Sequence, residues 1–142
     1  MRGYARFAHN LVGGMSKYLV DTSVCVAHIR GDEKAYAFLK QHVPSISVVT
    51  HIELVQGWEN KQDIRAARAI LRELHELSCT ESILQQALAF FEKYKLSHGI
   101  QFFDAVISST AIEHGLTLIT HNTKHFSFIP KLSVISFSSS GA

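Results

Sequence analysis

The stretch FFDAVISSTAIEHGLTLITHNTKHF, residues 102–126, contains the pattern that determines the fold class. Its first half predicts a helix from Phe103 to His114, closed by Gly115 at the position where helices often end in a left-handed glycine. Leu116 to Thr120 then form a short apolar run typical of a buried strand. A helix that leads directly into a buried strand is the unit from which α/β folds are built.

The same alternation occurs in the rest of the chain. Tyr18 to Val20 predict a strand that stops at a helix-capping cluster, Asp21-Thr22-Ser23. Ile46, Val48 and Val49 predict a second strand, after which Thr50 can cap a helix, and Leu132 to Phe137 predict another strand. Further helices are expected over residues 32–42, 61–76 and 80–98. Strands separated by helices predict an α/β sandwich with a mostly parallel sheet.

The composition bounds the possible functions. A chain of 142 residues, 46% of them hydrophobic and 18% charged, has the size of one domain with a substantial core. A formal net charge of +2 is too small for a basic nucleic-acid coat, so any nucleic-acid binding needs a local site. Cys25 and Cys79 match no metal or redox spacing and are expected to be buried free thiols. No apolar run reaches the roughly 20 residues of a membrane span, so a cytoplasmic protein without membrane contact is expected.

The first fourteen residues, MRGYARFAHNLVGG, show no clear periodicity and end in Gly13-Gly14. Met15 follows and opens the strand-like sequence of residues 17–21. We therefore expect residues 1–14 to be an added leader or a disordered extension, and residues 15–142 to form the domain.

Three of the twelve acidic residues interrupt sequence that should pack against a core: Asp21, Glu53 and Asp104. Burying a carboxylate without a partner costs several kcal/mol. Right-handed crossovers place helix N-termini at the carboxyl edge of a parallel sheet, so all three acids belong to that edge. Asn122, two residues past the third predicted strand, arrives at the same edge.

Carboxylates that converge on one crevice repel one another unless a cation lies between them. Oxygen ligands favour Mg²⁺ or Mn²⁺ over zinc, and such a site can activate water against a phosphodiester. The alternative is that each acid is a helix cap or an ion-pair partner, a reading that suits Asp21 and Asp104 but not Glu53. The shared edge favours metal-assisted phosphodiester hydrolysis.

These residues resemble those of PIN domains, and especially of the VapC-type toxins of bacterial and archaeal toxin–antitoxin pairs. The match runs from Lys17 to about Ser136. It includes YLVDTSV at residues 18–24, the stretch at residues 102–126, and the pattern S-x-x-T-x-x-E-L-x-x-G across Ser47, Thr50, Glu53, Leu54 and Gly57.

The resemblance implies a three-layer α/β/α sandwich with four to five strands and an endoribonuclease that uses Mg²⁺ or Mn²⁺. It implies metal-binding and catalytic roles for Asp21, Glu53, Asp104 and Asn122, the last at a position where many members have Asp. It further implies an RNA substrate, a VapB-type antitoxin and a homodimer. Thr22 and Thr120 match positions near the acids and have both a ligand-orienting and a capping interpretation.

Other candidates remain open at this point. His121 and His125 are four residues apart but lack the further ligands of a zinc site, so packing or support of the acids is expected of His125. Arg30, Lys61 and Lys124 are candidates for RNA phosphate contacts, and Trp58 for a partner interface or for packing. A housekeeping or catalytically silent RNA-binding module is the alternative function, whereas a DNA-directed flap nuclease would need additional acids and a helical arch.

Overall fold

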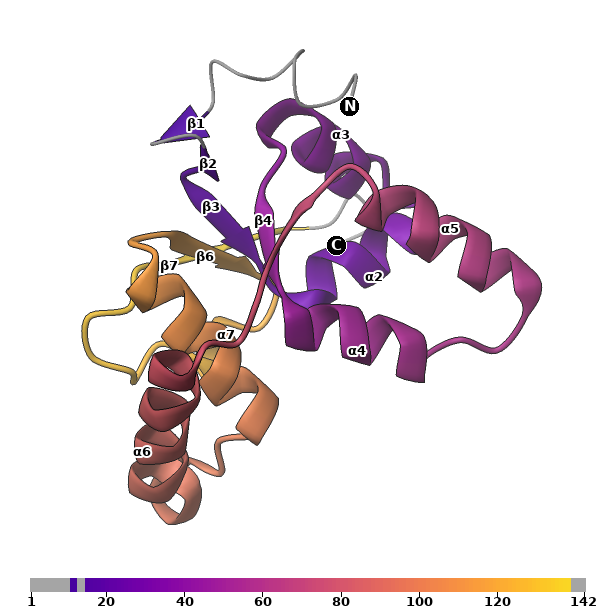
Figure 1. Cartoon of the computed structure of the whole chain (residues 1–142). Helices are drawn as coiled ribbons and strands as arrows, with labels where there is room; N and C mark the ends of the chain where they lie inside the picture. The colour runs from indigo at the N-terminus through magenta and orange to yellow at the C-terminus, as the bar shows by residue number, and fades with distance from the viewer. Residues whose placement is uncertain (1–10, 13–14, 139–142) are drawn as a thin grey trace.

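A central sheet of five strands organises the protein, in the order β5-β4-β3-β6-β7 (Figure 1). The computed structural model describes residues 11–12 and 15–138. Every neighbouring pair in this sheet is parallel. Its strands are β3 (Tyr18–Val20), β4 (Ser45–Ser47), β5 (His75–Leu77), β6 (Thr117–Thr120) and β7 (Val134–Ser136). A separate antiparallel pair joins β1 (Leu11–Val12) to β2 (Met15–Ser16).

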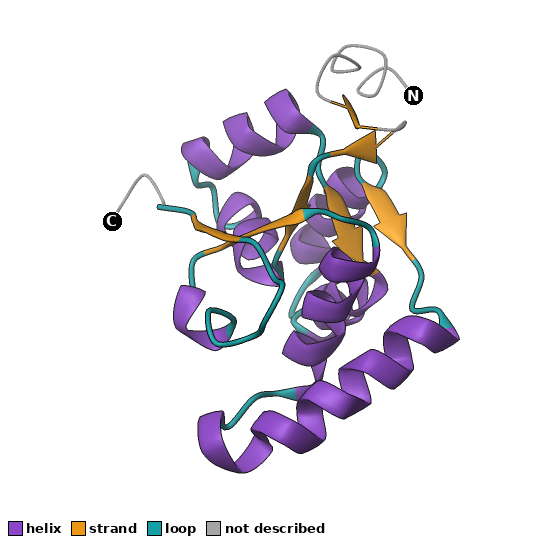
Figure 2. Ribbon diagram, turned by 90° about the vertical axis from the view of Figure 1, so that its left-hand side faces the viewer, coloured by secondary structure: helices purple, strands orange, loops and turns teal. Residues whose placement is uncertain are grey.

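Helices cover both faces of this sheet (Figure 2). They are α2 (Thr22–Ile29), α3 (Glu33–His42), α4 (Val48–Gln56), α5 (Lys61–Leu71), α6 (Glu81–His98) and α7 (Phe102–Glu113), with a short 3-10 helix, η2 (Thr123–His125). The predicted α/β/α sandwich is therefore confirmed, and its five strands are all parallel.

Alternation along the strands divides the core into two. Leu19 and Leu118 belong to a cluster with side chains from α6 and α7. Val20 and Ile119, their neighbours in sequence, belong to a second cluster with side chains from α2, α3 and α5. Successive side chains of a strand point to opposite faces, so the central strands must be apolar at every position.

The first correction concerns the second predicted strand. Val48 and Val49 are the first residues of α4, not part of a strand, and the helix is capped by Ser47 instead of Thr50. The Ser47 hydroxyl accepts a hydrogen bond from Val49 N at 3.2 Å, which satisfies a backbone donor at the helix start. β-Branched residues favour strands by propensity, and this cap together with burial outweighs that preference.

The second correction concerns the helix expected to reach Glu76. Helix α5 ends at Leu71, and residues His75–Leu77 form the edge strand β5, which pairs with β4. Leu71, Leu74 and Leu77 recur every three residues, a spacing that fits a helix. Residues 75–77 form a strand because they pair with β4, and this long-range pairing is not visible in any local pattern.

Three further predictions concern the N-terminal leader, the cysteines and membrane-spanning helices. The leader expected at residues 1–14 falls outside the described residues except for Leu11–Val12, which form β1. Both cysteines are free, but only Cys25 is fully buried. Over the described ranges, no helix is both long and apolar enough to cross a membrane.

Candidate active site

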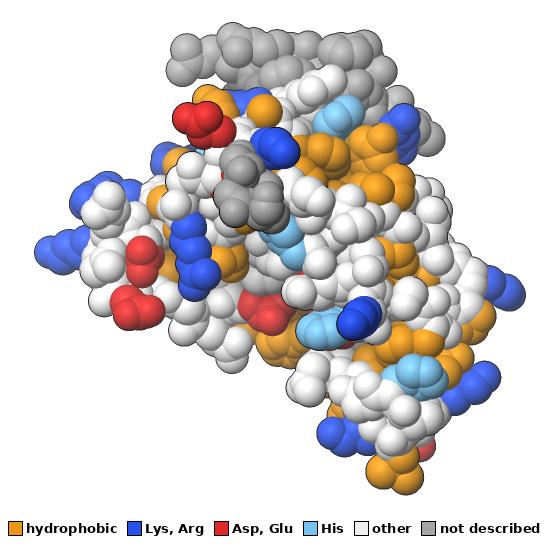
Figure 3. All heavy atoms as spheres, turned by 180° about the vertical axis from the view of Figure 1, so that it is seen from behind, with side chains coloured by type: hydrophobic (Ala, Val, Ile, Leu, Met, Phe, Trp, Pro, Cys, Tyr) orange, Lys and Arg blue, Asp and Glu red, His pale blue; other side chains and the backbone are white. Residues whose placement is uncertain are grey.

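A crevice of about 550 Å³ opens where β3 and β6 end and α2 and α7 begin. The residues that line it are Asp21, Thr22, Ser23, Val26, Glu53, Gln101, Phe102, Phe103, Asp104, Asn122 and His125. The structure therefore brings together all four residues that the sequence placed at one sheet edge. Seen from behind, acidic side chains lie in a hollow near the centre of the surface, with histidine and basic side chains at its rim (Figure 3).

Asp21 is the most buried of the acids, at 6% exposure, and it follows β3 as the N-cap of α2. Its Oδ1 accepts a hydrogen bond from Thr22 N at 2.8 Å. Its Oδ2 accepts one from the Ser23 hydroxyl at 2.9 Å and another from the Thr120 hydroxyl at 2.8 Å. Three donors compensate for much of the cost of burying this carboxylate and fix its orientation.

Ser23 and Thr120 also hold the loop that follows β6. The Ser23 oxygen accepts a hydrogen bond from His121 N at 3.3 Å, and the Thr120 oxygen accepts one from Asn122 N at 3.0 Å. Each hydroxyl therefore connects Asp21 Oδ2 to a backbone amide of this loop. The position of Asn122 depends on the same carboxylate oxygen that anchors the crevice.

Glu53 reaches the crevice from the middle of α4, which begins at Val48. The Thr22 hydroxyl donates to Glu53 Oε1 at 2.6 Å and also lies 2.9 Å from the hydroxyl of Thr50, which is fully buried. Burial raises the pKa of the Glu53 carboxyl, the Thr22 hydrogen bond lowers it, and the charge of Asp21 raises it. Glu53 thus has an orienting partner, and no salt bridge to it is found among the described residues.

Asp104 is the third residue of α7, so it is not the helix cap that one interpretation of the sequence allowed. The pKa of its carboxyl is raised from 3.8 to about 6, first by burial and then by the charge of Asp21. His125 lowers this pKa and Glu53 raises it. His125 Nδ1 lies 3.5 Å from Asp104 Oδ2, but the imidazole is 57% exposed, so its compensation is weak.

Asn122 lies at the exposed rim of the crevice, immediately before η2. Its backbone is fixed by Thr120, and its side chain makes no capping bond to η2. An amide oxygen at this position is a possible ligand for a hard cation, yet it adds no negative charge.

The charge balance of the crevice fits a cation. Glu53 and Asp104 both have raised pKa values, and in each case the charge of Asp21 is among the causes. Within the described part of the chain, no three Asp, Glu, His or Cys side chains are close enough to enclose an ion by themselves. Mg²⁺ keeps several waters and needs only one or two protein carboxylates, so the oxygen-rich crevice suits a hydrated ion.

Sequence reasoning missed several residues of the crevice. The sequence suggests only a capping role for Ser23, although the D-x-S spacing allows its hydroxyl to reach Asp21. Phe102 and Phe103 precede Asp104 and line the crevice. His125 was expected to pack or to support the acids, and its contact with Asp104 agrees with the second role. The His121 ring instead contacts Phe137, so the two histidines face different neighbours.

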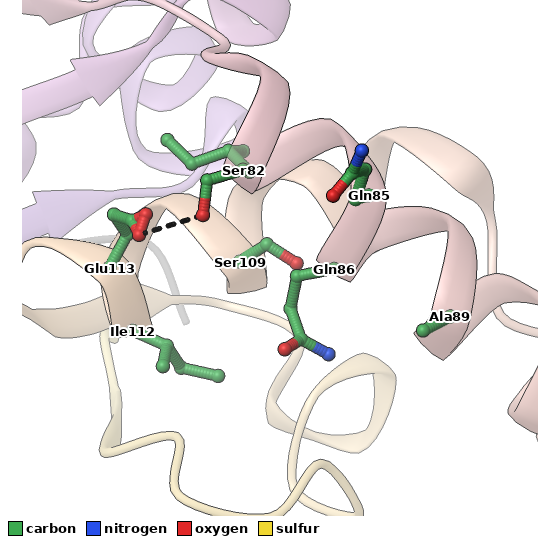
Figure 4. Close-up of a pocket in the computed structure, with 8 residues that line it drawn as sticks. Ser82, Gln85, Gln86, Ala89, Ser109, Ile112 and Glu113 are labelled. Carbon is green, nitrogen blue, oxygen red and sulfur yellow. Dashed lines mark hydrogen bonds between the residues drawn. The ribbon is translucent and has the colours of Figure 1, made fainter.

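A second hollow, of about 360 Å³, lies between α6 and α7 (Figure 4). Ser82 on α6 donates a hydrogen bond to Glu113 Oε1 on α7 at 3.2 Å across this hollow. Glu113 is the one ionisable side chain among the residues that line it. Because no further acid converges there, the hollow lacks the chemistry of the crevice.

Known proteins resemble this chain in sequence and in fold. The model of the PIN domain family matches residues 18–132. Ribonuclease VapC10 of Mycobacterium tuberculosis is 33% identical over 119 residues, which are 80% of this chain and 89% of that protein. Ribonuclease VapC19 of the same organism is 29% identical over 119 residues, 80% of this chain and 95% of that protein. A chain in a toxin–antitoxin complex from Klebsiella pneumoniae is 30% identical, with a TM-score of 0.68 over 83% of this chain and 95% of that chain.

The fold and the crevice define an α/β protein with an acidic site at the carboxyl edge of a parallel sheet. With the family model covering most of its length, the chain belongs to the PIN-domain family.

The raised pKa of Asp104 makes the stability of the metal-free protein depend on pH. Because the folded state binds this proton more tightly than the unfolded state, stability falls as pH rises from about 4 to about 6. Asp104→Asn removes this dependence and should stabilise the protein at pH 7 by up to about 3 kcal/mol. Urea unfolding of both proteins in EDTA at pH 4, 5, 6 and 7 measures the difference. If the free energies of unfolding of the two proteins change with pH in the same way, the pKa of Asp104 is not raised.

Proposed function

We propose that this protein is a metal-dependent endoribonuclease and the toxin of a VapBC-type toxin–antitoxin pair. The observation that carries the proposal is the convergence of Asp21, Glu53 and Asp104 on one crevice of a PIN domain. The relatives named ribonuclease VapC support RNA as the substrate. A net charge of +2 agrees with a local site for RNA instead of a general basic surface.

Asp21, Glu53, Asp104 and Asn122 would hold Mg²⁺ or Mn²⁺. The bound ion would supply Lewis-acid stabilisation of the phosphodiester and would lower the pKa of a coordinated water. Asp21 Oδ1 accepts one hydrogen bond and Oδ2 two, so Oδ1 is the oxygen with more room for a ligand. Glu53 is oriented by Thr22, and His125 positions Asp104.

The proposed partners follow from the relatives and from the surface. The toxin–antitoxin complex supports a VapB-type antitoxin, whose C-terminal segment would cover the crevice and place an Arg or Lys among the acids. A homodimer is supported by apolar side chains that are exposed on two helices, Ile52 and Val55 on α4 and Leu84 and Leu88 on α6. We further propose that residues 15–142 form the domain and that the protein acts in the cytoplasm.

Removing any one of the three carboxylates should abolish cleavage without unfolding the protein. Asp21→Asn, Glu53→Gln and Asp104→Asn each delete ligand charge, and we expect cleavage of RNA in Mn²⁺ or Mg²⁺ to fall at least about a hundredfold. Glu92→Gln, at an exposed position of α6, is the matched control and should cleave like the wild type. Single-turnover cleavage of a labelled RNA and thermal unfolding are the measurements. Activity that persists in Asp104→Asn and resists EDTA would rule out the metal-dependent site.

Asn122 should make the site a weak binder of divalent ions. Asn122→Asp raises the formal ligand charge from three to four, and we expect metal affinity to increase about tenfold. The added carboxylate should also lower metal-free stability through repulsion. Calorimetric titration with Mn²⁺ and Mg²⁺, alongside cleavage assays, compares the two proteins. Superimposable binding curves would show that residue 122 does not contact the ion, and the ligands would then be Asp21, Glu53 and Asp104.

A growth assay separates the toxin from the alternative of a housekeeping or catalytically silent RNA-binding module. Induced expression of the chain from Met15, without an antitoxin, should arrest bacterial growth. The Glu53→Gln protein, expressed to the same soluble level, should not. Normal growth with abundant soluble wild-type protein would favour the alternative function.

A further inference from the structure

A third hollow, of about 410 Å³, adjoins the crevice and shares Glu53 and Val26 with it. We call it the side hollow; it lies between α2, the end of α4 and the start of α5. It is lined also by Ile29, Leu54 and Gly57, and its polar residues are Arg30, Trp58, Glu59, Asn60 and Asp63. We infer that the side hollow binds the nucleobase next to the scissile phosphate and prefers a base with an exocyclic amino group. This inference rests on the proposed ribonuclease function.

Trp58 supplies the first reason. Its partly buried indole lines the side hollow, so the planar face of a base can pack against the accessible part of the ring. The Arg68 guanidinium lies 5.7 Å from the centre of the indole ring and fixes one side of the side chain.

The loop between α4 and α5 supplies acceptors as well as donors. Asn60 Oδ1 accepts a hydrogen bond from Asp63 N at 2.9 Å, and Asp63 Oδ2 accepts one from Glu59 N at 3.0 Å. These bonds fix the loop and leave the Asn60 amide group, Asp63 Oδ1 and the Glu59 carboxylate for a ligand. The edge of a nucleobase carries donors and acceptors side by side, which suits this mixed lining.

The charges orient the nucleotide. Glu53, Glu59 and Asp63 repel phosphate, whereas Arg30 is exposed at the margin of the side hollow and can contact it. The base must therefore face the carboxylates while the backbone stays near Arg30. Carboxylates accept hydrogen bonds from amino groups of bases, and uracil has none. Cytosine, adenine and guanine should bind better than uracil.

Continuity with the crevice favours RNA over a protein side chain as the occupant. Because Glu53 contributes to both cavities, a strand whose phosphodiester lies among the acids places an adjacent nucleotide at the side hollow. An apolar side chain of a protein partner would leave the Glu59 carboxylate and Asp63 Oδ1 without partners.

Trp58 is the single tryptophan of the chain, so its fluorescence reports directly on the side hollow. We would titrate the Asp104→Asn protein, which should not cleave RNA, in Mn²⁺ with tetracytidylate and with tetrauridylate, which have equal length and charge. Tetracytidylate should change the emission with a Kd about tenfold lower than that of tetrauridylate. Arg30→Ala should weaken both oligonucleotides by similar factors, and Arg65→Ala, on an exposed position of α5, is its control.

Asp63→Asn and Glu59→Gln should reduce the preference for cytidine while the emission of the free protein stays unchanged. Equal affinities for the two oligonucleotides would overturn the inference. If RNA is cleaved in Mn²⁺ but Trp58 does not respond, the side hollow is wrongly assigned and the proposed function stands. If the emission responds selectively to tetracytidylate but the wild-type protein cleaves no RNA, the side hollow binds bases and the proposed ribonuclease function is wrong.

Discussion

The Asp21 carboxylate is the interaction on which the rest of the site depends. It ends β3, caps α2, and receives hydroxyl groups from Ser23 and Thr120. The same hydroxyls hold the loop with Asn122, and Thr22 beside it orients Glu53. One buried group thus connects two strands, two helices and a loop, which explains how segments distant in sequence keep a common geometry.

The second constraint is the proximity of like charges. The pKa values of Glu53 and Asp104 are raised because both are partly buried near Asp21, and the single imidazole at Asp104 compensates weakly. A protein without function would gain stability by losing one of these acids. A divalent cation and a proton each neutralise negative charge among these carboxylates. The repulsion that lowers the stability of the metal-free protein therefore favours metal binding.

The sequence predicted the elements that have strong local signals, such as the helix from Phe103 to His114, which forms as Phe102–Glu113, and its neighbour β6. It also predicted which acids would converge, because parallel crossovers place helix starts at one sheet edge. It did not predict β5, because that strand depends on pairing with β4. It also missed the boundary at Val48, because β-branched residues favour strands by propensity. The contact between Ser23 and His121 and the lining of the side hollow depend on residues from distant segments, which no local pattern contains.

The account requires that a divalent ion occupy the crevice and not another part of the surface. Anomalous diffraction from crystals soaked in Mn²⁺ measures this most directly, since the signal identifies the ion independently of activity. We predict a peak within coordination distance, about 2.2 Å, of oxygens from Asp21 and at least one of Glu53 and Asp104. A crevice without such a peak, in crystals that bind Mn²⁺ elsewhere, would contradict the metal-dependent mechanism.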